Sequence, residues 1–161
     1  MNSKLKRSVS AAAASVLAAV SMTAAVPAAT VNAADTSFPY TIEGEDMEGA
    51  ELWEKIYENE LPGYSGKGFA YLTGGELSFT VTVPEDGMYT VSARAAQILN
   101  EEGRFQTMAV NGSEFSKTIP YTKEWKDFEF GVVRLNKGEN TISFLNKYGY
   151  MAIDSVTVKV A

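Results

Sequence analysis

Two carboxylate-bearing segments at opposite ends of one β-patterned region supply the most specific chemistry of the chain. Glu43-Gly44-Glu45 precedes a β-patterned region, and Ile153-Asp154-Ser155 stands at the end of it. Carboxylates are hard oxygen ligands of the kind that Ca²⁺ prefers. The two segments become neighbours if the first and last strands pair, and Glu43 and Glu45 point the same way if both lie on one strand. The pattern therefore predicts a calcium site, with ordinary surface acids as the alternative.

The first 34 residues have the organisation of a secretory signal peptide. Lys4, Lys6 and Arg7 form a basic segment, residues 9–26 form an Ala/Val/Ser-rich apolar segment, and residues 31–34 offer a small-residue cleavage site. A membrane anchor is the alternative, but the apolar run is mostly alanine interrupted by serine and threonine. We expect residues 1–34 to be removed and the protein to be secreted and extracellular.

Removal of this leader leaves 127 residues, which is enough for one domain with a hydrophobic core. The leader carries three basic residues and no acidic ones, so the 14 basic and 20 acidic residues of the chain leave a net charge of −9. This charge disfavours nucleic acid and anionic membrane surfaces as partners. The sequence therefore predicts one domain over residues 38–161, with no nucleic-acid partner and no membrane contact after signal cleavage.

Two residue types are absent, and this limits the possible chemistry. The sequence contains no cysteine and no histidine. Disulfides, thiolate metal sites and cysteine nucleophiles are therefore excluded. A Ser-His-Asp triad is also impossible, and the usual zinc ligand is missing. A bound calcium ion would be one way to stabilise an exported domain that has no disulfide.

Short runs of alternating apolar and polar residues predict half-buried β-strands. Turn signals separate these runs at residues 84–87, at Asn111-Gly112 and at residues 136–138, and no stretch has a sustained helical period. The expected class is all-β, an antiparallel sandwich of two sheets. The expected inward faces include Leu77, Phe79, Val81 and Val83; Tyr89, Val91, Ala93 and Ala95; and Phe128, Phe130 and Val132.

Four segments in this order make the chain resemble carbohydrate-binding module family 35, within the wider group that includes family 6. They are residues 40–45 (YTIEGE), 63–72 (GYSGKGFAYL), 83–95 (VPEDGMYTVSARA) and 148–154 (YGYMAID). The resemblance covers essentially all of residues 40–160. It implies a non-catalytic β-jelly roll with a structural calcium ion. The side-chain calcium ligands transferred from the family are Glu43, Glu45 and Asp154, joined by backbone carbonyls of a nearby loop.

The resemblance also implies a sugar site among the loops at one end of the sandwich. Aromatic rings there stack on a pyranose while polar groups bind its edge. The implied partners are a polysaccharide, with β-mannan favoured by the Tyr148-Gly149-Tyr150 segment, and a linked or associated glycoside hydrolase. The candidate carbohydrate-binding residues are Tyr64, Tyr71, Trp125, Asn146, Tyr148 and Tyr150. The charged residues at positions 123, 124, 126 and 127 predict that Trp125 lies in an exposed loop.

The chain departs from the family pattern at Ala152, where many members have an asparagine or aspartate that contacts sugar. Tyrosines in place of tryptophans at Tyr148 and Tyr150 also reduce the stacking area. We therefore expect weak binding, with a dissociation constant of about 10 μM to 1 mM.

Three alternatives to mannan binding stay open. One is a uronic-acid module that uses a second calcium ion in the ligand site, and another is a xylan- or pectin-binding module. A small glycosidase that uses paired carboxylates, such as Glu51 with Glu54 or Glu101 with Glu102, is the catalytic alternative.

Overall fold

The structure is a computed structural model, and it describes residues 38–161. The predicted signal peptide, residues 1–34, lies outside the described residues. Within residues 38–161, no helix is long and apolar enough to cross a membrane. One 3₁₀ turn, η1 (Gly44–Asp46), is present. The strands are β1 (Tyr40–Glu43), β2 (Leu52–Trp53), β3 (Lys55–Ile56), β4 (Asn59–Glu60), β5 (Phe69–Leu72), β6 (Glu76–Val83), β7 (Gly87–Ala96), β8 (Arg104–Val110), β9 (Ser113–Ile119), β10 (Lys126–Leu135), β11 (Gly138–Leu145) and β12 (Met151–Val160).

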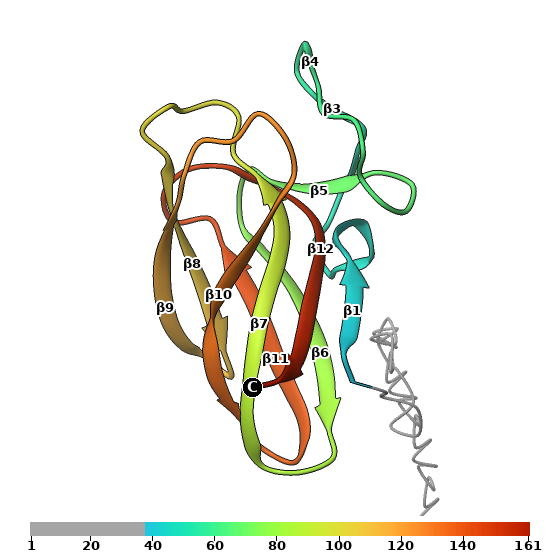
Figure 1. Cartoon of the computed structure of the whole chain (residues 1–161), viewed down its shortest axis with the longest axis vertical. Helices are drawn as coiled ribbons and strands as arrows, with labels where there is room; N and C mark the ends of the chain where they lie inside the picture. The colour runs from blue at the N-terminus through green and yellow to red at the C-terminus, as the bar shows by residue number, and fades with distance from the viewer. Residues whose placement is uncertain (1–37) are drawn as a thin grey trace, which may run out of the picture. The chain divides into compact units, whose positions relative to one another are not determined.

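Two antiparallel sheets face each other, as the sequence predicted (Figure 1). One has the order β10-β7-β12-β5-β2, with β1 added against β12, and the other has the order β6-β11-β8-β9. Strand β12 pairs with β5 through its first residues and with β1 through its later ones. The first strand, β1, and the last strand, β12, therefore lie side by side, and Glu43 pairs with Ser155.

The core between the sheets follows the predicted alternation. All four apolar residues of the run 77–83 and all four of the run 89–95 are buried. Phe130 and Phe144 pack edge to face at the centre, with ring centroids 5.0 Å apart. Aromatic rings prefer this geometry because the positive edge of one ring meets the negative face of the other.

The predicted face of β10 is wrong at Val132, which is 49 % exposed. A β-bulge between Glu129 and Gly131 inserts Phe130 as an extra residue opposite β7. An extra residue reverses the inside-outside order of all later side chains in the strand. Val133 and Leu135 consequently face the core in place of Val132.

The Asn111-Gly112 prediction is confirmed, because these two residues connect β8 to β9. Both have positive φ, 48° and 81°, which asparagine and glycine tolerate better than other residues. The side-chain oxygen of Asn111 also accepts a hydrogen bond from the backbone N–H of Thr141 at 3.0 Å. The turn is thus tied to β11 as well as to its own hairpin.

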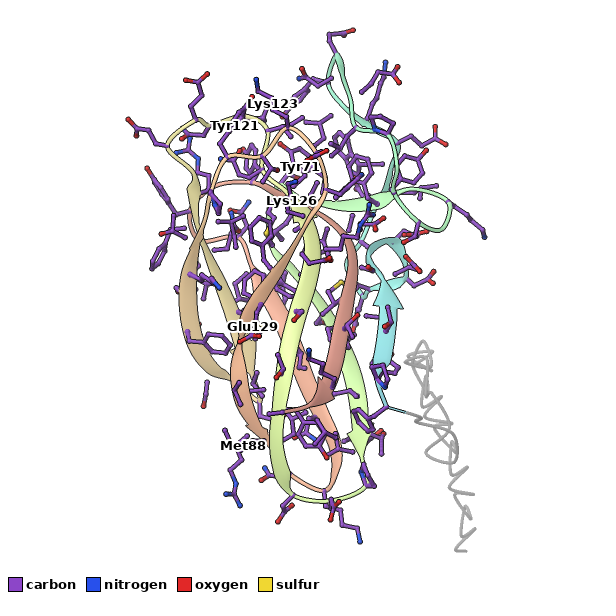
Figure 2. All side chains as sticks on the ribbon, viewed as in Figure 1. Tyr71, Met88, Tyr121, Lys123, Lys126 and Glu129 are labelled. Atoms are coloured by element: carbon purple, nitrogen blue, oxygen red, sulfur yellow. The ribbon has the colours of Figure 1, made fainter. Side chains whose placement is uncertain are left out.

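A smaller apolar cluster lies outside the main core. It contains Ile56, Leu61, Phe69, Tyr71, Ala96, Trp125 and Ala152. In Figure 1 the β3–β4 hairpin projects from the end of the sandwich near β5, away from the C-terminus. Figure 2 shows Tyr71 at that end, while Met88 lies at the opposite end. We call the end that carries Tyr71 the loop end.

Candidate functional site

Asp154 is fully buried and lies at a β-bulge of β12, where the pairing with β7 shifts between Ile153 and Ser155. A bulge can turn a side chain out of the normal alternation. Asp154 Oδ1 accepts a hydrogen bond from the Ser65 backbone N–H at 2.7 Å, and Oδ2 forms an ion pair with Arg94 Nη1. The other guanidinium nitrogen, Nη2, donates to the Gly63 carbonyl at 2.9 Å.

Residues 63–68, which we call the glycine loop, also bind both predicted glutamates. Ser65 Oγ donates to Glu43 Oε2 at 2.5 Å and lies 3.2 Å from Asp154 Oδ2. The Lys67 backbone N–H donates to Glu45 Oε1 at 2.8 Å. The glycine loop therefore holds three carboxylates that are far apart in the sequence.

Two glycines permit these close approaches. A Cβ on Gly44 would lie 2.0 Å from the Ile153 carbonyl oxygen, so no larger residue fits between η1 and β12. A Cβ on Gly66 would lie 2.2 Å from Glu45 Oε1, and Gly66 has a φ of +62°. Both positions favour glycine because the backbone must approach its neighbour closely.

The sequence argument that Glu43 and Glu45 share one face of a strand is wrong. Glu43 ends β1, but Glu45 belongs to η1, so the two side chains reach different residues of the glycine loop. Within residues 38–161, no three acidic, histidine or cysteine side chains converge closely enough to form a metal site. The calcium ligand set stays a prediction.

The donor chemistry around the glycine loop nevertheless fits a hard cation. Glu45 Oε2 is buried and has no hydrogen-bond partner. A buried carboxylate oxygen without a partner is costly, and a cation would satisfy it. Of the three carboxylates, Asp154 forms an ion pair with Arg94, whereas the hydrogen bonds to Glu43 and Glu45 come from an uncharged hydroxyl and a backbone N–H. These contacts therefore leave an excess of negative charge.

Tyr71 is the centre of a group of aromatic rings at the loop end. The Tyr71 ring centroid lies 5.2 Å from that of Trp53, 6.5 Å from that of Tyr57 and 5.9 Å from that of Tyr150, all edge to face. Tyr71 itself is only 7 % exposed, and its hydroxyl is buried without a hydrogen-bond partner. Burial, and to a lesser extent the neighbouring Tyr57 and Tyr150, raise the pKa of Tyr71 well above 10.

Tyr71→Phe tests this burial. In the unfolded chain the Tyr71 hydroxyl ionises near its ordinary pKa of 10.0, whereas in the folded protein burial keeps it protonated to higher pH. Ionisation of Tyr71 therefore does not affect the free energy of unfolding below pH 10. Above pH 10 it favours the unfolded chain, so the folded state loses stability as the pH rises. We expect Tyr71→Phe to change the free energy of unfolding at pH 7 by less than about 1 kcal/mol, because the hydroxyl has no partner to lose. Urea unfolding from pH 7 to pH 11 should show a smaller alkaline loss in the variant, and equal losses would contradict the assignment.

A pocket of about 390 Å³ opens beside these rings, and we call it the Tyr150 pocket. Tyr148 and Tyr150 are 64 % and 42 % exposed, so both offer ring surface to a ligand. The Arg104 guanidinium lies 5.5 Å from the centre of the Tyr148 ring. This contact fixes a cation beside an exposed aromatic face. The lining residues are Gln97, Leu99, Arg104, Tyr148, Gly149 and Tyr150.

The pocket wall is preformed by backbone contacts. Gln97 is buried, and its side-chain oxygen accepts hydrogen bonds from the backbone N–H groups of Leu99 and Asn100 at 2.8 and 3.0 Å. Its amide nitrogen donates to the Asn100 carbonyl at 2.7 Å. Gly149 has a φ of +95°, and a Cβ there would lie 2.4 Å from Arg104 Cδ. Gln97 thus holds the segment 97–100, and Gly149 leaves room for the Arg104 side chain at the start of β8.

Of the six residues predicted to bind carbohydrate, Tyr148 and Tyr150 line this pocket, and Tyr71 packs edge to face against Tyr150. The expected exposed position of Trp125 is wrong, because Trp125 is 7 % exposed. It packs edge to face on Phe69, and Arg94 lies 5.6 Å from its ring centre. The charged neighbours of Trp125 are exposed, but its own ring fills the smaller cluster.

Tyr64 and Asn146 do not line the Tyr150 pocket. Tyr64 is half-buried against the smaller cluster, with its ring centroid 5.8 Å from that of Phe69. The backbone N–H of Asn146 bonds to the Gly75 carbonyl at 3.0 Å. The sequence reasoning missed Gln97, Leu99 and Arg104. The sequence indicated a site role for them only through their positions, because Gln97 follows the predicted strand over 89–95 and Arg104 follows the acidic, glycine-containing segment 101–103.

The comparisons with known proteins agree with this fold. Residues 46–161 match the family model described as carbohydrate binding module (family 35). A mannan endo-1,4-beta-mannosidase of Thermothelomyces thermophilus is 31 % identical over 147 residues, which is 88 % of this chain and 28 % of that protein.

Two solved structures are also similar. A ruminal GH26 endo-beta-1,4-mannanase is 55 % identical, with a TM-score of 0.75 over 78 % of this chain and 26 % of that one. A family 35 carbohydrate binding module from Clostridium thermocellum is 24 % identical, with a TM-score of 0.61 over 78 % of this chain and all of that one, and this shows the fold. The chain spans about a quarter of the length of the two mannan-degrading relatives.

Proposed function

Because this chain belongs to carbohydrate binding module family 35, a family of non-catalytic binding modules, we propose that it binds β-mannan through the Tyr150 pocket. The single observation that carries the proposal is the pairing of exposed tyrosine rings with a fixed guanidinium in one pocket. A sugar presents apolar C–H faces and a polar edge, so its site needs aromatic surface together with hydrogen-bond donors. Tyr148, Tyr150 and Arg104 supply both.

The choice of mannan is supported by the relatives. Two of them are named as mannan-degrading enzymes, and one is 55 % identical over most of the described region. We propose that the module acts with a mannan-degrading glycoside hydrolase, linked or associated. Tethering would raise the local concentration of enzyme at the polysaccharide without any new catalytic contact.

A panel of immobilised polysaccharides tests the proposal. In affinity electrophoresis of the purified chain, we expect retardation by galactomannan or glucomannan and weaker retardation by xylan and pectin. Equal migration in all gels, with and without polysaccharide, would refute the proposed carbohydrate binding.

One observation supports a second candidate, the binding of uronic acids. The Arg104 guanidinium at the Tyr150 pocket can form paired hydrogen bonds with a carboxylate. Preferential binding of glucuronate- or galacturonate-containing oligosaccharides over manno-oligosaccharides would favour this candidate. A uronic-acid site of this kind would use a second calcium ion in the ligand site, so binding of the acidic sugar would depend on calcium.

The catalytic alternative is not supported. The residues of both suggested carboxylate pairs, Glu51 with Glu54 and Glu101 with Glu102, are exposed, and none lines the Tyr150 pocket. The family to which the chain belongs is a binding family.

We also propose that Glu43, Glu45 and Asp154 hold a structural calcium ion together with backbone carbonyls of a nearby loop. The three carboxylates do not by themselves form a metal-binding cluster in the described part of the chain. Bound calcium would neutralise the carboxylates and add a cross-link between η1, the glycine loop and β12. The support is the unpartnered Glu45 Oε2 and the excess of negative charge at the glycine loop. A ligand that binds only the folded state stabilises that state.

Chelation should therefore lower the melting temperature of the purified chain by several degrees, and added CaCl₂ should restore it. Glu45→Gln keeps the size of the side chain and removes the charge, so it should abolish the response to calcium. Elemental analysis of the dialysed protein should find calcium. Identical melting curves in chelator and in calcium, with no metal found, would refute this site.

Export is a further part of the proposal, and it concerns residues outside the described region. If residues 1–34 are a signal peptide, protein recovered from the culture medium should begin near Asp35. An intact N-terminus on medium-derived protein would contradict it.

A further inference from the structure

We infer that the β3–β4 hairpin adds a second sugar-binding position, so that one polysaccharide chain occupies both this position and the Tyr150 pocket. The inference rests on the proposed function and extends it to the length of chain engaged. Its basis is a second pocket of about 530 Å³ on β2 and the hairpin, which we call the hairpin pocket. The lining residues are Leu52, Trp53, Glu54, Lys55 and Tyr57.

The hairpin pocket has the mixed chemistry that a sugar requires. Leu52 and Tyr57 are both 55 % exposed, so the pocket offers apolar surface to a ligand. Glu54 and Lys55 place an acceptor and a donor of hydrogen bonds beside them. Apolar surface with a few polar groups is typical of small-ligand sites.

The conformation of Tyr57 points to the same conclusion. Tyr57 has a φ of 54°, in the left-handed region that bulky residues rarely adopt. It lies in the two-residue turn between Lys55–Ile56 and Asn59–Glu60, where glycine or asparagine would be relaxed. Backbone strain of this kind is concentrated at functional sites, and here it holds a half-exposed aromatic ring at the tip of the hairpin.

Tyr71 connects the two pockets. Its ring touches Tyr150 of the first pocket and Trp53 and Tyr57 of the second, with centroid distances between 5.2 and 6.5 Å. The two pockets are therefore neighbours on one aromatic wall at the loop end. A polymer that lies on Tyr150 can continue onto Trp53 and Tyr57, whereas a ligand of one or two sugar units reaches only one pocket.

Calorimetry on the purified chain with β-1,4-mannobiose and β-1,4-mannohexaose tests the inference. We expect the hexasaccharide to bind more tightly, and Tyr57→Gly to weaken it about five- to tenfold while leaving the disaccharide unchanged. Glycine removes the ring and relaxes the positive φ, so folding should be preserved, and Tyr57→Asn provides a second relaxed variant. Glu58→Ala, in the same turn but outside the pocket wall, is the control and should bind like the unchanged chain.

Each outcome has a distinct meaning. If neither oligosaccharide binds to the unchanged chain, the proposed function fails and this inference fails with it. If both bind with equal affinity and the Tyr57 variants match the control, the Tyr150 pocket stands and only the second position is overturned. Melting curves of the variants within the range of the control establish that a loss of binding is not a loss of fold.

Discussion

Asp154→Ala is expected to destabilise the domain by about 2–4 kcal/mol, the largest effect of a single change at the carboxylate cluster. The side chain is fully buried, and its removal leaves the Ser65 backbone N–H and the Arg94 guanidinium without their partner. Removal of one member of a buried ion pair typically costs about 3–5 kcal/mol. We place the value lower because the Arg94 side chain is 34 % exposed and water can partly replace the carboxylate.

Urea unfolding at neutral pH measures this loss. Lys147→Ala is the matched control, because it breaks an ion pair with Glu114 in which both side chains are about half exposed. Exposed pairs contribute little to stability, so the control should unfold like the unchanged chain. An Asp154→Ala variant that is as stable as the control would show that the glycine loop is held by other contacts.

Tyr148→Ala and Tyr150→Ala are each expected to weaken the binding of β-1,4-mannohexaose by about 10- to 100-fold. Both rings are substantially exposed at the Tyr150 pocket, so truncation removes stacking surface from the ligand. Arg104→Ala should have a similar effect, because the guanidinium is the only charged group in the pocket wall as described for residues 38–161. The three losses need not add, because Arg104 and Tyr148 contact each other.

Phe105→Ala is the matched control for this series. Phe105 is 49 % exposed and follows Arg104 directly, but it does not line the pocket. Calorimetry should find its affinity unchanged. If the tyrosine variants and Phe105→Ala bind equally well, the Tyr150 pocket is not the sugar site.

The sheets were predictable because burial on one face of a strand imposes a period of two on the sequence. The run 77–83 and the run 89–95 obey this rule throughout, and the Asn111-Gly112 turn has a strong local signature. The face of Val132 was predicted wrongly, because an inserted residue at Phe130 changes the alternation. Gly131, an isolated glycine inside the strand pattern, was the signal of such a bulge.

The candidate site was predictable only in part. Glu43, Asp154 and Tyr150 were selected from segments that resemble the family pattern. The structure brings Glu43 and Asp154 to Ser65 and places Tyr150 in the pocket wall, while their roles stay predictions. The positions of the other site residues depend on how the loops fold. The charged residues around Trp125 predicted an exposed position, but tertiary packing on Phe69 buries its ring.

Arg104 could not be predicted as a pocket residue for the same reason. Its contact with Tyr148 joins parts of the chain that are 44 positions apart, and the backbone conformation of Gly149 makes room for it. Strand patterns predict which side chains are buried, but they do not predict which loops meet.

A crystal structure of the full chain with β-1,4-mannohexaose is the most direct test of the central claim, that Tyr148, Tyr150 and Arg104 form the carbohydrate site. We predict a pyranose ring against the two tyrosines, with the Arg104 guanidinium hydrogen-bonded to the sugar. Sugar density at another face of the sandwich, with the Tyr150 pocket filled by solvent, would contradict the account.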